Sequence, residues 1–123
     1  MKIREIATNL NLQVLAGEEA LDREVSSGYC SDLISDFMAN GKPGCLWLTL
    51  QTHMNVVAVA LLAEAAGVVF TGGREVAPEV CRKAEDEGLP LLATSTRTFE
   101  VAGQLYQLLH GKCEVRNGRW EQG

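Results

Sequence analysis

Residues 45–73 read CLWLTLQTHMNVVAVALLAEAAGVVFTGG, and this stretch sets the architecture expected for the whole chain. The short apolar run Leu46–Leu50 predicts a buried strand, and Val68–Phe70 predicts a second one. Between them, the alanine- and leucine-rich segment Met54–Ala66 predicts a helix, closed by Gly67 as a residue of positive φ. A strand, a helix and a strand in about thirty residues make a βαβ unit with parallel strands and a right-handed crossover.

The other predicted elements pack around this unit. Before it we expect a helix with the apolar stripe Ile3, Ile6, Ala7 and Leu10 and a strand at Gln13–Ala16. We also expect a strand within Glu24–Cys30, where Gly28 marks either a bulge or an edge position, and a helix capped by Ser31 or Asp32. After it we expect a helix from Pro78 to Gly88, a strand at Leu89–Ala93, and a helix from Thr98 to His110 in which Gly103 marks a close approach. The predicted fold class is therefore α/β, a small, mostly parallel sheet with helices packed on it.

The length of 123 residues suits a single domain, which we assign to residues 1–111. Residues 112–123 form a C-terminal extension. Within it, Asn117-Gly118 lies between Val115 and Trp120 and predicts a β-hairpin. An isolated hairpin is marginally stable, so we expect it to lean on the body or on a second chain.

Composition and charge argue against nucleic acids and membranes as partners. Hydrophobic residues make up 46% of the chain, which is too high for a disordered protein. The net charge is −5 and the basic residues form no cluster, so we expect no nucleic-acid partner. Met54–Ala66 is too short to span a bilayer, which takes roughly 20 residues, so we expect no membrane partner.

Two further features favour the cytoplasm. The N-terminus, Met1–Glu5, lacks the apolar core of a signal peptide. The four cysteines are widely spaced and contain no C-x-x-C pair, so we expect free thiols in a reducing compartment rather than a disulfide or a metal site.

Three polar turns follow the three best-defined strands. In an open α/β sheet, ligands bind beyond the carboxyl ends of the strands, and the helices that follow these turns favour anions at their N-termini. The turns predict a pocket for a phosphate or a nucleotide-like ligand, although hydroxyls before helices and glycines after strands are also ordinary caps and turns. The candidate ligand-binding residues are Gln51, Thr52, His53, Thr71, Gly72, Gly73, Arg74, Thr94, Ser95, Thr96 and Arg97.

No catalytic, metal or cofactor site is expected. Gly41-Lys42 is followed by Pro43 instead of the Ser or Thr of a P-loop. No G-x-S-x-G motif is present, and the two histidines have no metal-binding spacing. His53 beside Thr52 is either a catalytic pair or a histidine at the start of a helix.

The helix predicted at Met54–Ala66 is apolar nearly all round, with Asn55 and Glu64 as its polar residues. One side packs on the sheet, and the opposite side would otherwise face water. A homodimer would cover that side, and the candidate interface residues are Val56, Val59, Ala60 and Ala63. The alternatives are cover by the C-terminal hairpin, or a helix fully enclosed within one copy.

Several short motifs give the chain a family resemblance. Asp22-Arg23 and Thr71-Gly72-Gly73 match the letters after which the DRTGG domain family is named. The stretch Gly28–Leu33 before a helix, the Gln-Thr-His-x-Asn within Leu46–Asn55, and Phe99 also look like that family. The chain resembles the family over roughly residues 1–110, through the order and spacing of these motifs.

The resemblance implies a regulatory or assembly role. DRTGG domains occur as single small proteins, beside CBS domains in regulatory pyrophosphatases, and in some long phosphate acetyltransferases. They are similar in fold to the non-catalytic N-terminal domain of HPr kinase/phosphorylase, they tend to dimerise, and they have no established catalytic residues.

Three functions follow from these observations. The first is a cytoplasmic, non-catalytic regulatory or assembly module that acts as a homodimer, with a possible protein partner. The second is a sensor that binds a nucleotide or a phosphorylated metabolite at the three turns. The third is a small enzyme that uses His53 with Thr52 or Arg97.

Overall fold

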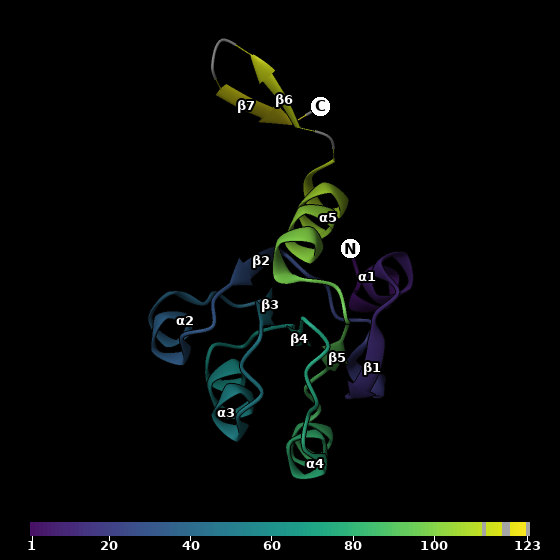
Figure 1. Ribbon diagram of the computed structural model, residues 1–123, viewed down its shortest axis with the longest axis vertical. Helices are drawn as coiled ribbons and strands as arrows, with labels where there is room; N and C mark the ends of the chain where they lie inside the picture. The colour runs from purple at the N-terminus through teal and green to yellow at the C-terminus, as the bar shows by residue number, and fades with distance from the viewer. Residues whose placement is uncertain (112, 117–118, 123) are drawn as a thin grey trace.

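The computed structural model describes residues 1–111, 113–116 and 119–122, and its main body is a sheet between two layers of helices (Figure 1). Five strands form the sheet in the order β1-β5-β4-β3-β2. Strands β2 to β5 run parallel, and β1 lies antiparallel to β5 at one edge, which confirms the predicted fold class. The strand bounds are β1 Gln13–Ala16, β2 Ser27–Cys30, β3 Cys45–Thr49, β4 Gly67–Phe70 and β5 Leu91–Ala93.

Helices cover both faces of this sheet. Helices α2, α3 and α4 lie on one face, and α1 and α5 lie on the other (Figure 1). The helix bounds are α1 Ile3–Leu10, α2 Ile34–Asn40, α3 Met54–Leu62, α4 Pro78–Glu87 and α5 Thr98–His110. No helix in the described part of the chain is long and apolar enough to cross a membrane.

The central strands are buried on both faces. Every residue of β3 and β4 is buried, which explains why these strands are continuous apolar runs without alternation. Trp47 belongs to the core on the α2–α4 side, where Phe37 stacks on it with ring centroids 3.8 Å apart. Leu46 and Leu48 belong to the core on the α1–α5 side. The sheet therefore lies between two separate hydrophobic cores, one on each of its faces.

The predicted βαβ unit is present as β3, α3 and β4, but its helix ends earlier than predicted. Helix α3 stops at Leu62, and Glu64 takes the left-handed conformation with φ 57°. Gly67 is the first residue of β4, so its predicted role as the closing residue was wrong. A Cβ atom at Gly67 would lie 3.0 Å from the carbonyl oxygen of Pro90, so this glycine permits a close approach between neighbouring strands.

Helix α3 is the middle helix of its layer, and this position buries most of its surface (Figure 1). The residues predicted for a dimer interface are Val56, Val59 and Ala60, which are buried within the single chain, and Ala63, which is half-buried. The side that faces outward carries Asn55, Ala58 and Leu62. An apolar helix is therefore accommodated here without a second copy, because α2, α4 and the sheet surround it.

Capping of α2 differs from the prediction that Ser31 or Asp32 caps it. The N-cap residue is Leu33, and no side chain satisfies the first turn. The hydroxyl of Ser31 accepts a hydrogen bond from the Leu33 N–H at 3.2 Å, before the helix begins. The carboxylate of Asp32 is directed to β3 instead, as described below. Neither residue caps the helix because both lie before its N-cap position.

Two glycine predictions had opposite outcomes. Gly28 lies in β2, which is an edge strand as predicted. Gly103 was predicted to mark a close approach in α5, and this was wrong. It is exposed, and a Cβ atom there would meet nothing within 4 Å.

The C-terminal extension contains two short strands, β6 Cys113–Arg116 and β7 Arg119–Gln122. They pair antiparallel, with Val115 opposite Trp120, as the predicted hairpin requires. The predicted turn residues Asn117 and Gly118 lie outside the described residues. In Figure 1 the strand pair lies beyond the C-terminal end of α5. The boundary between domain and extension at residues 111 and 112 stays a prediction.

Candidate functional site

The predicted ligand-binding residues gather at one edge of the sheet. Residues 50–53 follow β3, residues 71–77 follow β4, and residues 94–97 follow β5. Because these three strands are parallel, their carboxyl ends meet at the same edge, which we call the carboxyl edge. The sequence therefore placed the three turns correctly relative to one another.

Two of the turns are hydrogen bonded to each other. The Gly72 N–H donates to the carbonyl of Thr96 at 2.9 Å, and the Gly73 N–H donates to the carbonyl of Thr94 at 3.0 Å. Both glycines have positive φ, and a Cβ atom on Gly72 would come within 2.9 Å of Leu50 Cδ2. The glycine amides are already occupied, so they do not form an open cradle for a phosphate.

The hydroxyls of Thr71 and Thr98 extend this connection. Their oxygens lie 2.6 Å apart, and Thr71 is fully buried. Thr98 is the first residue of α5, so the bond joins the end of β4 to the start of that helix. The backbone that carries the candidate residues is therefore held in place by fixed hydrogen bonds between turns.

Asp32 belongs to the same edge, although it is not among the ligand-binding residues predicted from the sequence. Its carboxylate Oδ1 accepts from the Leu50 N–H at 2.7 Å and from the Thr49 hydroxyl at 3.2 Å. It thereby ties the segment after β2 to the end of β3. The available signal was its position, since Asp32 follows a parallel strand just as the three predicted turns do.

His53 has a structural role at the start of α3. It is the N-cap residue, and its Nδ1 accepts from the Asn55 N–H at 3.0 Å. Within the described residues it makes no hydrogen bond to Thr52. Of the two alternatives left open by the sequence, the structure shows the histidine at the start of a helix.

Two arginines supply positive charge at the carboxyl edge. Arg74 and Arg97 are exposed, and neither forms an ion pair with any residue that the structure describes. Glu75 and Glu100, which are also exposed, lie close to them in the sequence. The guanidinium groups are therefore accessible to an anionic ligand, with carboxylates nearby that would limit its affinity.

The chemistry of Cys30, which ends β2 at this edge, argues against this thiol as a nucleophile. Partial burial raises the pKa of the Cys30 thiol, and the negative charge of Asp32 raises it further. A thiol with a raised pKa is protonated at neutral pH and reacts poorly.

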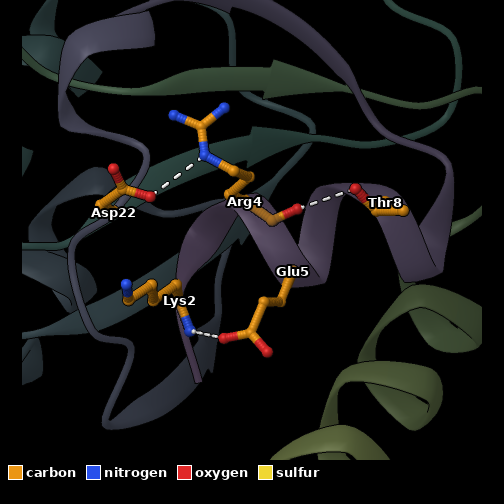
Figure 2. A network of polar contacts seen from close by, with 5 residues as sticks. All are labelled: Lys2, Arg4, Glu5, Thr8 and Asp22. Carbon is orange, nitrogen blue, oxygen red and sulfur yellow. Dashed lines mark hydrogen bonds and ion pairs between the residues drawn. The ribbon is translucent and has the colours of Figure 1, made fainter.

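The N-terminus and residues 21–25 lie at the opposite end of the parallel strands, where these strands begin. The N–H of Ile3 donates to the Arg23 carbonyl, and the N–H of Arg4 donates to the Leu21 carbonyl. Figure 2 shows the side-chain contacts here: Arg4 Nε donates to Asp22 at 3.1 Å, and Glu5 accepts from the Lys2 N–H. The hydrogen bond and positive charge from Arg4 lower the pKa of the Asp22 carboxyl.

A hollow of about 460 Å³ lies at this opposite end. Its lining includes Arg23 and Gly44, together with residues around the end of α3. The full lining is Arg23, Glu24, Gly44, Leu61, Glu64, Ala65 and Ala66. Gly44 and Ala66 directly precede β3 and β4, so this hollow is remote along the strands from the carboxyl edge.

A comparison with protein families gives a match to the DRTGG domain over residues 5–108. The chain belongs to the DRTGG domain family. In this DRTGG domain, Asp22-Arg23 and Thr71-Gly72-Gly73, which match the family name, lie at opposite ends of the parallel strands. Asp22 pairs with α1, whereas Thr71 follows β4. The two parts of the signature therefore do not form one site.

A solved structure shares this DRTGG fold. It contains the CBS and DRTGG domains of the regulatory region of a Clostridium perfringens pyrophosphatase, complexed with the activator diadenosine tetraphosphate. The TM-score is 0.70 at 13% sequence identity, and the match covers 86% of this chain and 46% of that chain. Our chain thus corresponds to less than half of that regulatory region. A comparison with curated proteins gave no match.

Proposed function

We propose that this DRTGG domain is a non-catalytic regulatory module that binds a nucleotide or a phosphorylated metabolite at its carboxyl edge. The observation that carries the proposal is the position of Arg74 and Arg97. They lie on two turns that are hydrogen bonded to each other, and both are exposed and unpaired within the described residues. The regulatory region of the pyrophosphatase, part of which shares this fold, is complexed with the activator diadenosine tetraphosphate, and this supports a nucleotide as the ligand class.

We assign the main contacts to side chains rather than to the amides of the glycine turn. The N–H groups of Gly72 and Gly73 are occupied by carbonyls, whereas the guanidinium groups of Arg74 and Arg97 are exposed donors. Arginine suits this task because its planar fork binds phosphate oxygens through two parallel hydrogen bonds.

The structural roles of the polar groups at this edge support a non-catalytic function. His53 caps α3, the Asp32 carboxylate accepts from Leu50 and Thr49, and the hydroxyls of Thr71 and Thr98 are paired. A general acid or base must reach the substrate proton within hydrogen-bonding distance. These groups are used to hold the backbone, so we assign them no role in proton transfer.

Thermal unfolding with a ligand panel tests the proposal. A ligand that binds the folded state raises the melting temperature, so we expect a shift with nucleotides or sugar phosphates. The shift should be lost in Arg97→Gln and in Arg74→Gln. Arg82→Gln, which removes an exposed charge from α4, is the matched control and should keep it. No shift with any member of a broad panel at millimolar concentration would rule the proposal out.

A second candidate function is assembly as a homodimer, supported by an exposed apolar surface on α2 and α3. Leu62 is 78% exposed and Met38 is 59% exposed. Both line a groove of about 300 Å³ that also includes Val59 and Ala63 from the predicted interface. The burial of Val56 and Ala60 moves the proposed contact outward to Leu62 and Met38.

Light scattering at micromolar concentration tests the homodimer. We expect the mass of a dimer for the wild type and the mass of a monomer for Leu62→Glu. Thr8→Glu places the same charge on α1, on the other face of the sheet, and should leave the dimer intact. A monomer mass for the wild-type protein would exclude this function.

We also propose that the module works in the cytoplasm. The cysteines whose side chains the structure describes, Cys30, Cys45 and Cys81, are free thiols. Free thiols are typical of proteins in reducing compartments, which supports this location.

A further inference from the structure

Phe99 presents an aromatic ring to solvent at the start of α5. It is 86% exposed, more than any other large apolar side chain in the described part of the chain. Val101, two residues later, faces the core at 2% exposure. On an α-helix, position 99 lies about 200° from position 101, so Phe99 is directed away from the core by the geometry of the helix. The fold therefore fixes the outward direction of this side chain.

Phe99 belongs to the first turn of α5, the helix that follows the turn carrying Arg97. Arg97 lies two residues before Phe99, at the end of the turn after β5. Thr98, between them, contacts Thr71 at the start of the turn that carries Arg74. These contacts hold the first turn of α5 against both arginine-bearing segments. Phe99 is thus an exposed aromatic residue on a helix whose first turn is hydrogen bonded to the turn that carries Arg74.

The two chemistries together match one ligand class. A phosphate group requires the guanidinium donors and makes no use of an aromatic ring. A nucleobase stacks on an exposed aromatic side chain, and this stacking tolerates any base because every base has a π-face. A nucleotide uses both features at once.

We infer that Phe99 is the base-stacking residue of the carboxyl edge, and that the ligand is a nucleotide rather than a phosphorylated metabolite without a base. This inference rests on the proposed function, because it requires Arg74 and Arg97 to hold the phosphates. Phe99 then determines specificity: it distinguishes ligands by the presence of a base, whereas the arginines bind them by charge.

Calorimetric titration with ATP and with inorganic tripolyphosphate separates the two contributions, since the adenosine is what distinguishes these ligands. We expect the wild-type protein to bind ATP more tightly than tripolyphosphate. Phe99→Leu, which keeps apolar bulk without a ring, should weaken ATP binding by about 5- to 150-fold and leave tripolyphosphate binding unchanged. Phe99→Trp should preserve the ATP affinity. Tyr106→Leu, which removes an exposed aromatic ring about two turns further along α5, is the control and should change neither affinity.

The outcomes distinguish the inference from the function on which it rests. Equal affinities of the wild-type protein for ATP and tripolyphosphate would overturn the role of Phe99 and leave anion binding at the edge intact. An unchanged ATP affinity in Phe99→Leu would do the same. If neither ligand binds at millimolar concentration, the inference and the proposed ligand-binding function both fail.

Discussion

The hydroxyl oxygens of Thr71 and Thr98 lie 2.6 Å apart where β4 ends and α5 begins. Replacing either residue by valine keeps its shape but leaves the other hydroxyl without this partner. We expect Thr71→Val and Thr98→Val each to lower the free energy of unfolding by about 1–2 kcal/mol. The double variant should cost less than the sum, because it leaves no unpaired hydroxyl. Urea unfolding of the four proteins measures this coupling.

Thr8→Val is the control for this double-mutant cycle. Its hydroxyl donates to the Arg4 carbonyl on the exposed side of α1, so its loss should change stability by less than about 0.5 kcal/mol. If the effects of Thr71→Val and Thr98→Val on stability were simply additive, the hydroxyl pair would not couple β4 to α5.

Asp32 provides a second stability test at the same edge. Asp32→Ala removes the acceptor for the Leu50 N–H and the Thr49 hydroxyl, and Thr49 is fully buried. We expect a loss of about 1–2 kcal/mol in the free energy of unfolding. Asp86→Ala, at an exposed position of α4, should have little effect. Equal stability of the two variants would show that the Asp32 contacts contribute nothing to folding.

The ion pair between Arg4 and Asp22 predicts a pH dependence. The pKa of Asp22 is lowered in the folded protein, first by the hydrogen bond from Arg4 and then by its charge. A lowered pKa contributes stability above the ordinary carboxylate pKa, and this contribution is lost as the pH falls through the folded pKa, below about pH 4. A carbon-13 titration should find Asp22 below its usual range, and Arg4→Gln should raise the pKa toward it.

The control for this titration is Lys83→Gln. Lys83 pairs with Glu87 in α4, so removing its charge should leave the Asp22 titration unchanged. The assignment to Arg4 would be refuted by an Asp22 pKa that is the same in wild type and Arg4→Gln.

Two glycine-to-alanine substitutions should have opposite signs. Gly103 is exposed in α5 with free space around it, so Gly103→Ala should raise the free energy of unfolding by about 1 kcal/mol. Gly17 has φ 76°, and a Cβ atom there would come within 2.6 Å of the Leu89 carbonyl carbon. Gly17→Ala should therefore destabilise the protein by about 2 kcal/mol or more. Thermal unfolding of both variants measures the signs, and a destabilising Gly103→Ala would contradict this account.

The strands and helices were accessible from the sequence because their signals are local. The fully apolar run in β3 and the capping glycine Gly88 after α4 each specify structure within a few residues. The burial of α3 was not accessible in this way. Its composition shows that the helix is apolar on all sides, but the number of neighbours that cover it depends on where α2 and α4 pack.

In the candidate site, too, some features follow from local sequence and others depend on contacts between distant segments. Parallel strands imply a common edge, so the three turns were placed together from the sequence alone. The bonds from Gly72 and Gly73 to the turn after β5 depend on how two loops fit in space, and no local pattern encodes that fit. The direction of the Asp32 carboxylate toward β3 is a further contact between distant segments. Such contacts decide which donors remain for a ligand.

The pairing of β1 with β5 joins the beginning of the domain to its end. During synthesis on the ribosome, β1 emerges early but has no partner until Ala93 and its neighbours appear. The backbone N–H and C=O groups of β1 therefore stay unpaired while most of the domain is synthesised. Deletion of either β1 or β5 should accordingly damage the same side of the sheet, and fusions that delay the C-terminal half should favour aggregation.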